Sequence, residues 1–250
     1  MPKFCANLNW LFQELPLEER FEAAKEAGFD AVELLNPYEG NAQDILNALA
    51  KYELRMALIN CPPPNYAGGE PGYAAVSGSR FKTDFKRSLR YAEVLGAEHI
   101  HIMSGAARGR EAHETFVENL RWAAIEAPAQ SLTIEPINTD DMPGYFLCDF
   151  DQALQIVEEI NAPNLNFQFD VYHARKIHGD VLKTWAHVKK RVVHIQVAQT
   201  PQRNEPDQSE IDYSAFFQQL DADGYDGWVS GEYRPKTTTV DGLGWLLKYS

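Results

Sequence analysis

Four oxygen-bearing side chains stand at or near the ends of short β-rich runs in the second half of the chain. The four residues with their runs are Glu135 after Ser131–Ile134, Asp170 after Leu165–Phe169, Gln196 within Val192–Val197, and Glu232 after Gly227–Gly231. Their separations of 35, 26 and 36 residues (135 to 170, 170 to 196, 196 to 232) are each about the length of one strand-helix unit. If these strands are parallel neighbours, the four side chains converge at one end of a sheet.

These residue types favour a metal site. Three carboxylates on neighbouring strands repel one another strongly unless a cation lies among them. Three acids and one amide oxygen, with no cysteine or histidine, form a hard ligand set that favours Mg²⁺ or Mn²⁺ over Zn²⁺. Any one of these acids alone is better explained as a solvated strand end, whereas four in register on consecutive strands indicate a shared function.

The rest of the chain repeats the pattern of a strand followed by a helix. The strands are expected at 4–8, 31–35, 55–60, 99–103, 131–135, 165–170, 192–197 and 228–233. The helices are expected at 17–27, 42–51, 80–95, 112–127, 151–160, from 173 to near 189, 213–220 and 240–247. Apolar residues at helical spacing and glycines after the helices, such as Gly28 and Gly96, support these boundaries.

Eight such alternations in 250 residues predict a single α/β domain, residues 1–250, folded as a (β/α)8 TIM barrel. A doubly wound open sheet is the structural alternative. That fold usually carries a glycine-rich turn after its first strand, but here the turn reads Leu8-Asn-Trp-Leu11. The chain also lacks a P-loop. In a barrel, the four polar residues would lie on strands five to eight, at the catalytic rim.

Composition narrows the classes of partner. A net charge of −13 disfavours nucleic acid and anionic membrane surfaces, which are bound through clustered Lys and Arg. The chain has no run of 18 apolar residues and no signal peptide at its start, so we expect a soluble, cytoplasmic protein. Cys5, Cys61 and Cys148 lack the spacing of a thiolate metal site or a disulfide framework. The sequence leaves open whether the chain forms a homo-oligomer.

Five segments carry the polar residues in a distinctive order: Ile134-Glu-Pro-Ile-Asn138, Phe169-Asp-Val-Tyr-His173, His194-Ile-Gln-Val-Ala198, Arg203-Asn-Glu-Pro206 and Gly231-Glu-Tyr-Arg-Pro235. Together these segments resemble the hydroxypyruvate isomerase family of the xylose isomerase-like barrels. Shorter similarities at Phe4–Leu8, Gly28–Glu33, Pro143–Phe146 and Glu210–Tyr213 extend this resemblance over essentially the whole chain. Each motif is modest, but their order and spacing are specific.

The resemblance implies isomerisation of a small hydroxy-carbonyl substrate, hydroxypyruvate to tartronate semialdehyde, by proton transfer through an enediol. It implies that Glu135 and Glu232 both hold the metal and move the proton. Asp170 and Gln196 match the other two metal ligands, and His173 and Arg203 match positions that bind substrate oxygens. The chemistry is consistent with these roles, because proton abstraction next to a carbonyl needs a base and a cation near the developing oxyanion.

One further histidine is a weaker candidate for substrate binding. His101 faces inward on the fourth strand if His99 and Met103 share its side, but a hydrogen-bonded core histidine explains it equally well. For Arg203, an ordinary place in a polar loop is as good an explanation as a substrate contact. The cationic Arg203 would suit a substrate carboxylate.

The chain departs from the family pattern next to the expected site. It reads Gln202-Arg-Asn-Glu-Pro206 where many members have a histidine before Glu-Pro, and Gln199 and Arg234 replace common residues. A 2-oxo-tetronate isomerase or a ketose epimerase is therefore the close alternative. A non-catalytic sugar-binding paralogue would be expected to have lost one glutamate, and an endonuclease of this barrel type would need a histidine-rich multi-zinc centre and a basic face.

A long loop is the expected cover of the site. Residues 61–77 hold three consecutive prolines and several glycines, and loops of that length in compact domains are often active-site lids. A surface loop without such a role is the equal alternative.

Overall fold

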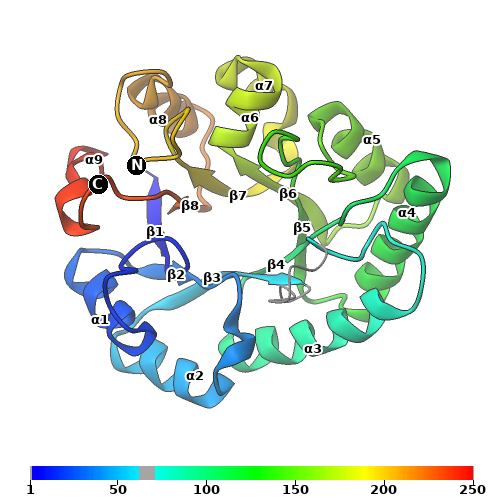
Figure 1. Cartoon of the computed structure of the whole chain (residues 1–250), viewed down its shortest axis with the longest axis horizontal. Coiled ribbons are helices and arrows are strands. Elements are labelled where there is room, and N and C mark those ends of the chain that lie inside the picture. The colour runs from blue at the N-terminus through cyan, green and yellow to red at the C-terminus, as the bar shows by residue number, and fades with distance from the viewer. Residues whose placement is uncertain (1, 62–70, 250) are drawn as a thin grey trace.

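The computed structural model describes residues 2–61 and 71–249, and its eight parallel strands close into a barrel in chain order (Figure 1). The strands are β1 (Lys3–Asn7), β2 (Ala31–Glu33), β3 (Arg55–Cys61), β4 (His99–Ile102), β5 (Ser131–Ile134), β6 (Leu165–Asp170), β7 (Val192–Val197) and β8 (Trp228–Gly231). β1 pairs with both β2 and β8, so the sheet has no free edge. The predicted (β/α)8 barrel is confirmed, and the open sheet is excluded.

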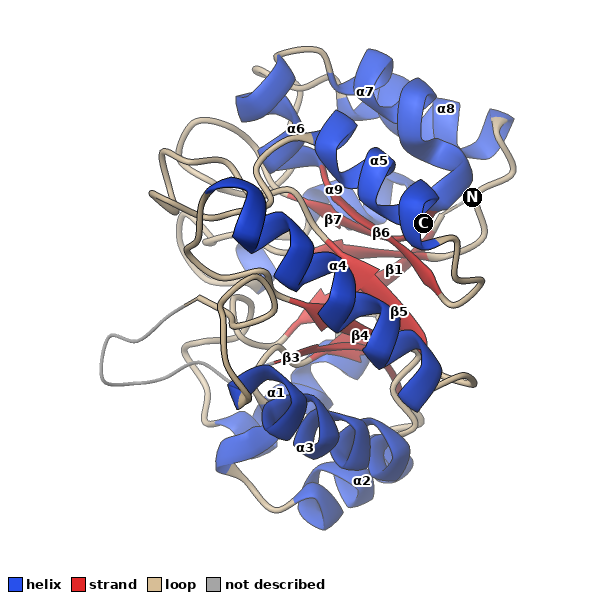
Figure 2. Ribbon diagram, turned by 90° about the vertical axis from the view of Figure 1, so that its right-hand side faces the viewer, coloured by secondary structure: helices blue, strands red, loops and turns tan. Residues whose placement is uncertain are grey.

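Helices follow the strands and surround the barrel (Figures 1 and 2). They are α1 (Leu17–Glu26), α2 (Ala42–Lys51), α3 (Arg80–Leu95), α4 (Gly109–Glu126), α5 (Phe150–Ile160), α6 (Val171–His178), α7 (Val181–Val188), α8 (Tyr213–Ala222) and α9 (Gly244–Tyr249). Short 3-10 turns lie at η1 (Pro37–Glu39), η2 (Lys189–Arg191) and η3 (Val240–Gly242). Among the described residues, no helix combines the length and apolar character needed to span a membrane.

Two predicted helices are wrong in detail. The sixth unit holds two helices in place of one, because Gly179 ends α6 in the left-handed conformation with φ of 77°. Asp180 then begins α7 by accepting a hydrogen bond from the backbone N–H of Lys183. The predicted last helix, 240–247, is divided into the turn η3 and the helix α9.

The pairing of β6 with its neighbours places polar side chains at one rim of the barrel. The Cα atom of Asp170 pairs in register with that of Gln196, and Gln196 pairs with Ser230 on β8. Because all strands are parallel, their carboxyl ends share this rim, from which the loops that lead into the helices also start. Glu135 and Glu232 each come directly after their strands at the same rim.

An aromatic cluster outside β6 fixes which side chains of that strand face inward. Phe169 packs edge-on against Trp185 of α7, with ring centroids 5.6 Å apart, and stacks on Phe216 of α8. Side chains alternate along a strand, so packing of Phe169 on the helices directs its neighbours Gln168 and Asp170 into the barrel. The cluster between barrel and helices therefore positions two polar groups of the interior.

Candidate active site

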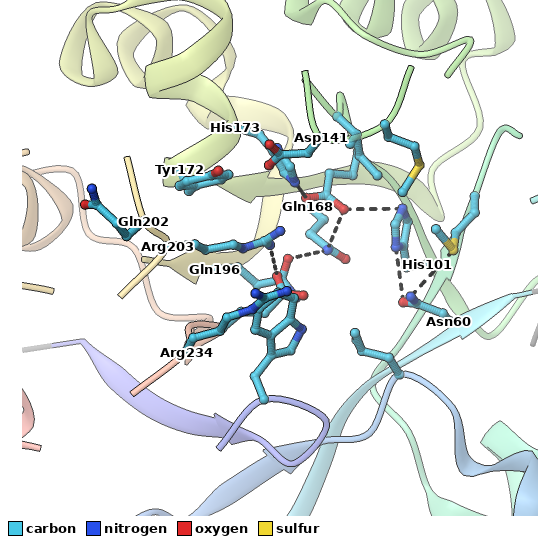
Figure 3. A pocket seen from close by; sticks show the side chains of 17 residues that line it. Asn60, His101, Asp141, Gln168, Tyr172, His173, Gln196, Gln202, Arg203 and Arg234 are labelled. Atoms are coloured by element: carbon cyan, nitrogen blue, oxygen red, sulfur yellow. Dashed lines mark hydrogen bonds and ion pairs between the residues drawn. The ribbon is translucent and has the colours of Figure 1, made fainter. Parts of the chain in front are cut away.

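The carboxyl ends of the strands enclose a cavity of about 470 Å³ (Figure 3). Its lining residues are Trp10, Leu35, Asn60, His101, Met103, Glu135, Ile137, Asp141, Met142, Gln168, Tyr172, His173, Gln196, Gln202, Arg203, Glu232 and Arg234. Six of the seven predicted site residues are among them. The seventh, Asp170, is buried beside the cavity and contacts two of its lining residues, His173 and Arg203. The structure therefore brings all seven together.

Arg203 joins two of the predicted carboxylates. Its Nη2 atom donates to Asp170 Oδ2 and to Glu232 Oε2, both at 3.0 Å. Arg203 itself adopts a left-handed backbone conformation, with φ of 58°, which costs a residue with a side chain roughly 1 kcal/mol or more. Such strain persists where surrounding contacts hold a residue in place, and here two buried acids do so.

Glu135 and Glu232 are hard to ionise in the protein alone. Burial, followed by the charges of Asp170 and Glu232, raises the pKa of Glu135 well above its usual range. Burial raises the pKa of Glu232 to about 8, although the Arg203 charge opposes that shift. For Arg203, burial lowers the pKa, but the surrounding carboxylates outweigh it and raise the pKa above its usual value. One guanidinium thus faces three buried acids.

The residues of this cluster fit a divalent cation. Glu135, Asp170 and His173 present possible ligand atoms that lie within 4.8 Å of one another. Glu135 Oε1 is buried and has no hydrogen-bond partner among the described residues. A cation would relieve the repulsion between the carboxylates, and oxygen donors suit Mg²⁺ or Mn²⁺. The charge balance and the open carboxylate oxygen both support the predicted metal site.

The hydrogen bonds of the His173 ring indicate a role other than metal binding. The Asn138 carboxamide is oriented by Asp141, whose backbone N–H donates to Asn138 Oδ1 at 3.1 Å. Asn138 Nδ2 therefore donates to His173 Nδ1, at 2.6 Å. Burial lowers the pKa of His173 to about 4, so the neutral ring carries its proton on Nε2. That N–H lies 3.6 Å from Asp170 Oδ2 and is available as a donor to a ligand.

His101 offers the complementary group. Its Nδ1 atom lies 3.1 Å from Asn60 Oδ1, to which it donates, and burial lowers its pKa to about 3. In the neutral ring, Nε2 is then an acceptor. It is buried 3.7 Å from Glu135 Oε2, and no described residue donates a hydrogen bond to it. The cavity thus presents one imidazole donor and one imidazole acceptor beside the acids.

Gln196 is held by a chain of hydrogen bonds that begins at Glu33, a residue that the sequence reasoning missed. Gln196 Nε2 donates to Glu33 Oε1 at 2.7 Å, which leaves its Oε1 atom to accept from Gln168 Nε2 at 2.6 Å. Gln168 Nε2 also donates to Glu135 Oε2 at 3.0 Å. Glu33 additionally accepts from Asn7 at 2.6 Å and pairs with His194 at 2.6 Å.

Sequence features could have identified two of the site residues that the prediction missed, Glu33 and Gln168. Glu33 ends an apolar strand, Ala31-Val-Glu33, in the same manner as the predicted acids. Gln168 stands two residues before Asp170 and so shares its face of β6. Trp10 lies in the loop after β1, and no sequence pattern distinguishes it from other loop aromatics.

We predict that Glu33→Ala lowers the free energy of unfolding by about 3 to 5 kcal/mol, because it leaves Asn7, Gln196 and His194 without their buried hydrogen-bond partner. Glu33→Gln retains an oxygen acceptor and should cost less. Urea denaturation measures both. The exposed Glu26 on α1 provides the control Glu26→Gln, expected to change stability by less than about 0.5 kcal/mol. A Glu33→Ala protein as stable as this control would contradict the inferred network.

The whole chain matches known proteins. The family model described as xylose isomerase-like TIM barrel covers residues 21–249. A 2-oxo-tetronate isomerase from Cupriavidus necator is 44% identical, over 100% of this chain and 99% of its own length. Hydroxypyruvate isomerase from Escherichia coli is 36% identical, with 100% of each chain covered.

Solved structures show the same architecture. A crystal structure described as an AP endonuclease of family 2 from Brucella melitensis has a TM-score of 0.96 and 41% identity, covering 100% of this chain and 99% of the other. A 3-keto-D-glucoside 4-epimerase from Escherichia coli has a TM-score of 0.81, covering 99% of this chain and 100% of the other. Its 19% identity extends the likeness to the fold alone.

Proposed function

The chain belongs to the xylose isomerase-like TIM barrel family, in the group of full-length relatives named as isomerases, and we propose on this premise that it interconverts hydroxypyruvate and tartronate semialdehyde. The observation that carries the proposal is the pair Glu135 and Glu232. Both are buried carboxyl groups that line one cavity, and they come from strands that are not neighbours in the closed barrel. A substrate between them would meet a carboxyl group on two sides.

The proposed reaction moves one carbon-bound proton. One glutamate takes a proton from C3 of hydroxypyruvate, which converts the carbinol and the adjacent carbonyl into an enediol. The other glutamate returns a proton to C2, and the proton of the C3 hydroxyl moves to the C2 oxygen, so that C3 becomes the aldehyde. No electron donor or acceptor outside the substrate is needed. Each glutamate acts as a base only when ionised, and a bound cation would lower the raised pKa of Glu232 and Glu135.

The other cavity residues support this chemistry. The Nε2–H group of His173 suits the carbonyl oxygen, where negative charge develops during proton abstraction. His101 Nε2 suits a substrate hydroxyl, because it is an acceptor with no donor in the part of the chain that the structure describes. We assign Glu135, Asp170, Gln196 and Glu232 as the residues that would hold Mg²⁺ or Mn²⁺. When bound, such a cation supplies Lewis acidity toward the substrate oxygens.

A four-carbon 2-oxo-tetronate is the second candidate substrate. The relative from Cupriavidus necator carries that name at 44% identity, whereas hydroxypyruvate isomerase from Escherichia coli is 36% identical. Both acids share a carbonyl, an adjacent hydroxyl and a carboxylate, so the same proton transfer applies. The endonuclease description of the Brucella melitensis structure finds less support here, because the cavity lining is rich in acids and amides and the chain carries a charge of −13.

Metal removal and a substrate panel test the proposal. Protein treated with chelator and reloaded with Mg²⁺ or Mn²⁺ would be assayed by proton NMR on hydroxypyruvate, 2-oxo-tetronates and neutral ketoses. An oligonucleotide with an abasic site would be assayed for incision in parallel. We expect turnover of a 2-oxo acid and a loss of at least about 100-fold on chelation, reversed by the metal. Epimerised ketoses or incised DNA, with neither acid converted, would overturn the proposal.

A further inference from the structure

Two arginines reach the cavity, and they are in different electrostatic states. Arg203 donates to Asp170 and Glu232, so buried acids already neutralise its charge. Arg234 is exposed, lines the same cavity, and forms no ion pair with any acid in the part of the chain that the structure describes. In a protein with a net charge of −13, an uncompensated guanidinium at a cavity wall is available to an anionic ligand.

The structure holds Arg234 in place without neutralising its charge with an acid of the described residues. Its guanidinium carbon lies 5.4 Å from the ring centroid of Trp10, and that of Arg203 lies 4.6 Å from the same ring. One indole therefore keeps the two guanidinium groups next to each other, as Figure 3 shows for the labelled arginines. A guanidinium placed over an aromatic ring is ordered by that contact, and its N–H donors can still bind a ligand.

Backbone contacts fix Arg234 relative to Arg203. The N–H of Arg234 donates to the Arg203 carbonyl at 2.8 Å, and Asn204 Nδ2 donates to the Arg234 carbonyl at 2.8 Å. The loops after β7 and β8 are thereby joined at this point. Arg203 Nε is buried and has no hydrogen-bond partner in residues 2–61 and 71–249, so this pair of loops offers one further open donor beside Arg234.

We propose that Arg234 binds the carboxylate of the substrate and thereby selects 2-oxo acids over neutral hydroxy-carbonyl compounds; this inference rests on the proposed function. The reacting carbons must lie between Glu135 and Glu232, and Arg203 pairs with the second of these. The adjacent Arg234 is therefore placed for the end of the substrate that does not react. A carboxylate accepts two parallel N–H donors from a guanidinium, whereas a hydroxymethyl group in its place cannot.

The test compares hydroxypyruvate with dihydroxyacetone, a neutral compound that carries a hydroxymethyl group in place of the carboxylate and reacts through the same kind of enediol. For Arg234→Gln, we expect KM for hydroxypyruvate to rise about 10- to 100-fold with kcat nearly unchanged, because the contact is equally present before and during reaction. Kinetic constants for dihydroxyacetone should stay within about twofold. Arg234→Lys, which keeps the charge but loses the fork of donors, should fall between wild type and Arg234→Gln.

Lys236→Gln is the matched control. Lys236 is an exposed cation two residues along, it pairs with Asp207 at 3.5 Å, and it is not part of the cavity wall. Its removal changes the net charge equally and should leave KM within about twofold of wild type. If Arg234→Gln leaves KM for hydroxypyruvate unchanged, or raises it no more than Lys236→Gln does, the inference is overturned while the proposed function stands.

A binding measurement distinguishes failure of the carboxylate site from failure of the proposed reaction. Titration calorimetry with glycerate and with glycerol needs no turnover. We expect Arg234→Gln to bind glycerate more weakly than wild type does, and to bind glycerol as wild type does. If wild-type protein converts neither hydroxypyruvate nor a 2-oxo-tetronate but glycerate binding still depends on Arg234, the proposed reaction fails and the carboxylate site remains. Equal glycerate affinity in wild type and Arg234→Gln would overturn the carboxylate site.

Discussion

Glu135→Gln and Glu232→Gln are each expected to lower the rate of isomerisation by roughly 100- to 10,000-fold with the barrel intact, because positioned acid-base groups contribute about that much. Glutamine keeps the size of the side chain and one oxygen for the metal, but it cannot accept a carbon-bound proton. Proton NMR in deuterated solvent follows both product formation and exchange of the carbon-bound hydrogen, and circular dichroism confirms that each variant is folded.

Exchange of the carbon-bound hydrogen without isomerisation would show which glutamate removes the proton and which one returns it. A variant that has lost only the second proton transfer should still wash deuterium into the substrate, whereas one that has lost the first should show neither process. The two losses should not add in the double variant, because both groups serve one reaction sequence. Glu118→Gln, on the exposed face of α4, is the control. If both single variants exchange and isomerise at near wild-type rates with metal bound, neither glutamate is the base.

The fold could be predicted because its local signals agree with one another. Apolar strands and helical spacing recur eight times, glycines such as Gly28 and Gly96 follow several of the helices, and eight such units admit a closed parallel barrel. The divided sixth unit could not be predicted from apolar spacing, because α6 and α7 carry apolar residues on both sides of the break. Gly179 and Asp180, a helix end followed by a helix start, were the signal.

Site residues could be predicted where their positions follow from the ends of the strands alone. Register and parallel pairing bring Asp170 and Gln196 side by side, and the same logic applies to Glu135 and Glu232. The sequence could not show which acids each arginine contacts. Arg203 contacts two acids, whereas Arg234 contacts none among the described residues. Those contacts depend on loop conformation, including the left-handed backbone of Arg203, which no periodicity encodes. Most of the predicted lid, residues 62–70, lies outside the described residues.

Asp170→Asn is expected to weaken binding of Mn²⁺ at least about 100-fold, because it removes one full charge from the predicted ligand set while preserving shape. Asp170 has two separate functions in the structure. Its Oδ1 atom accepts from the backbone N–H groups of Tyr172 and His173, which caps α6, and its Oδ2 atom contacts Arg203. Asparagine retains an oxygen for the cap. It loses the charged contact with Arg203 but also removes one of three repelling carboxylates, so the free energy of unfolding should change by less than about 2 kcal/mol. Titration calorimetry with Mn²⁺ and urea denaturation measure the two effects.

The next helix supplies the control. Asp180 caps α7 through the backbone N–H of Lys183 and does not line the cavity. Asp180→Ala and Asp170→Ala should each lose about 1 kcal/mol of capping energy, but only the second should also lose the metal. Loss of Mn²⁺ affinity in Asp170→Asn without a matching loss of stability would therefore separate the ligand role from the cap. If Asp170→Asn binds Mn²⁺ as wild type does, the acids around Arg203 are not the metal site, and Arg203 alone compensates their charge.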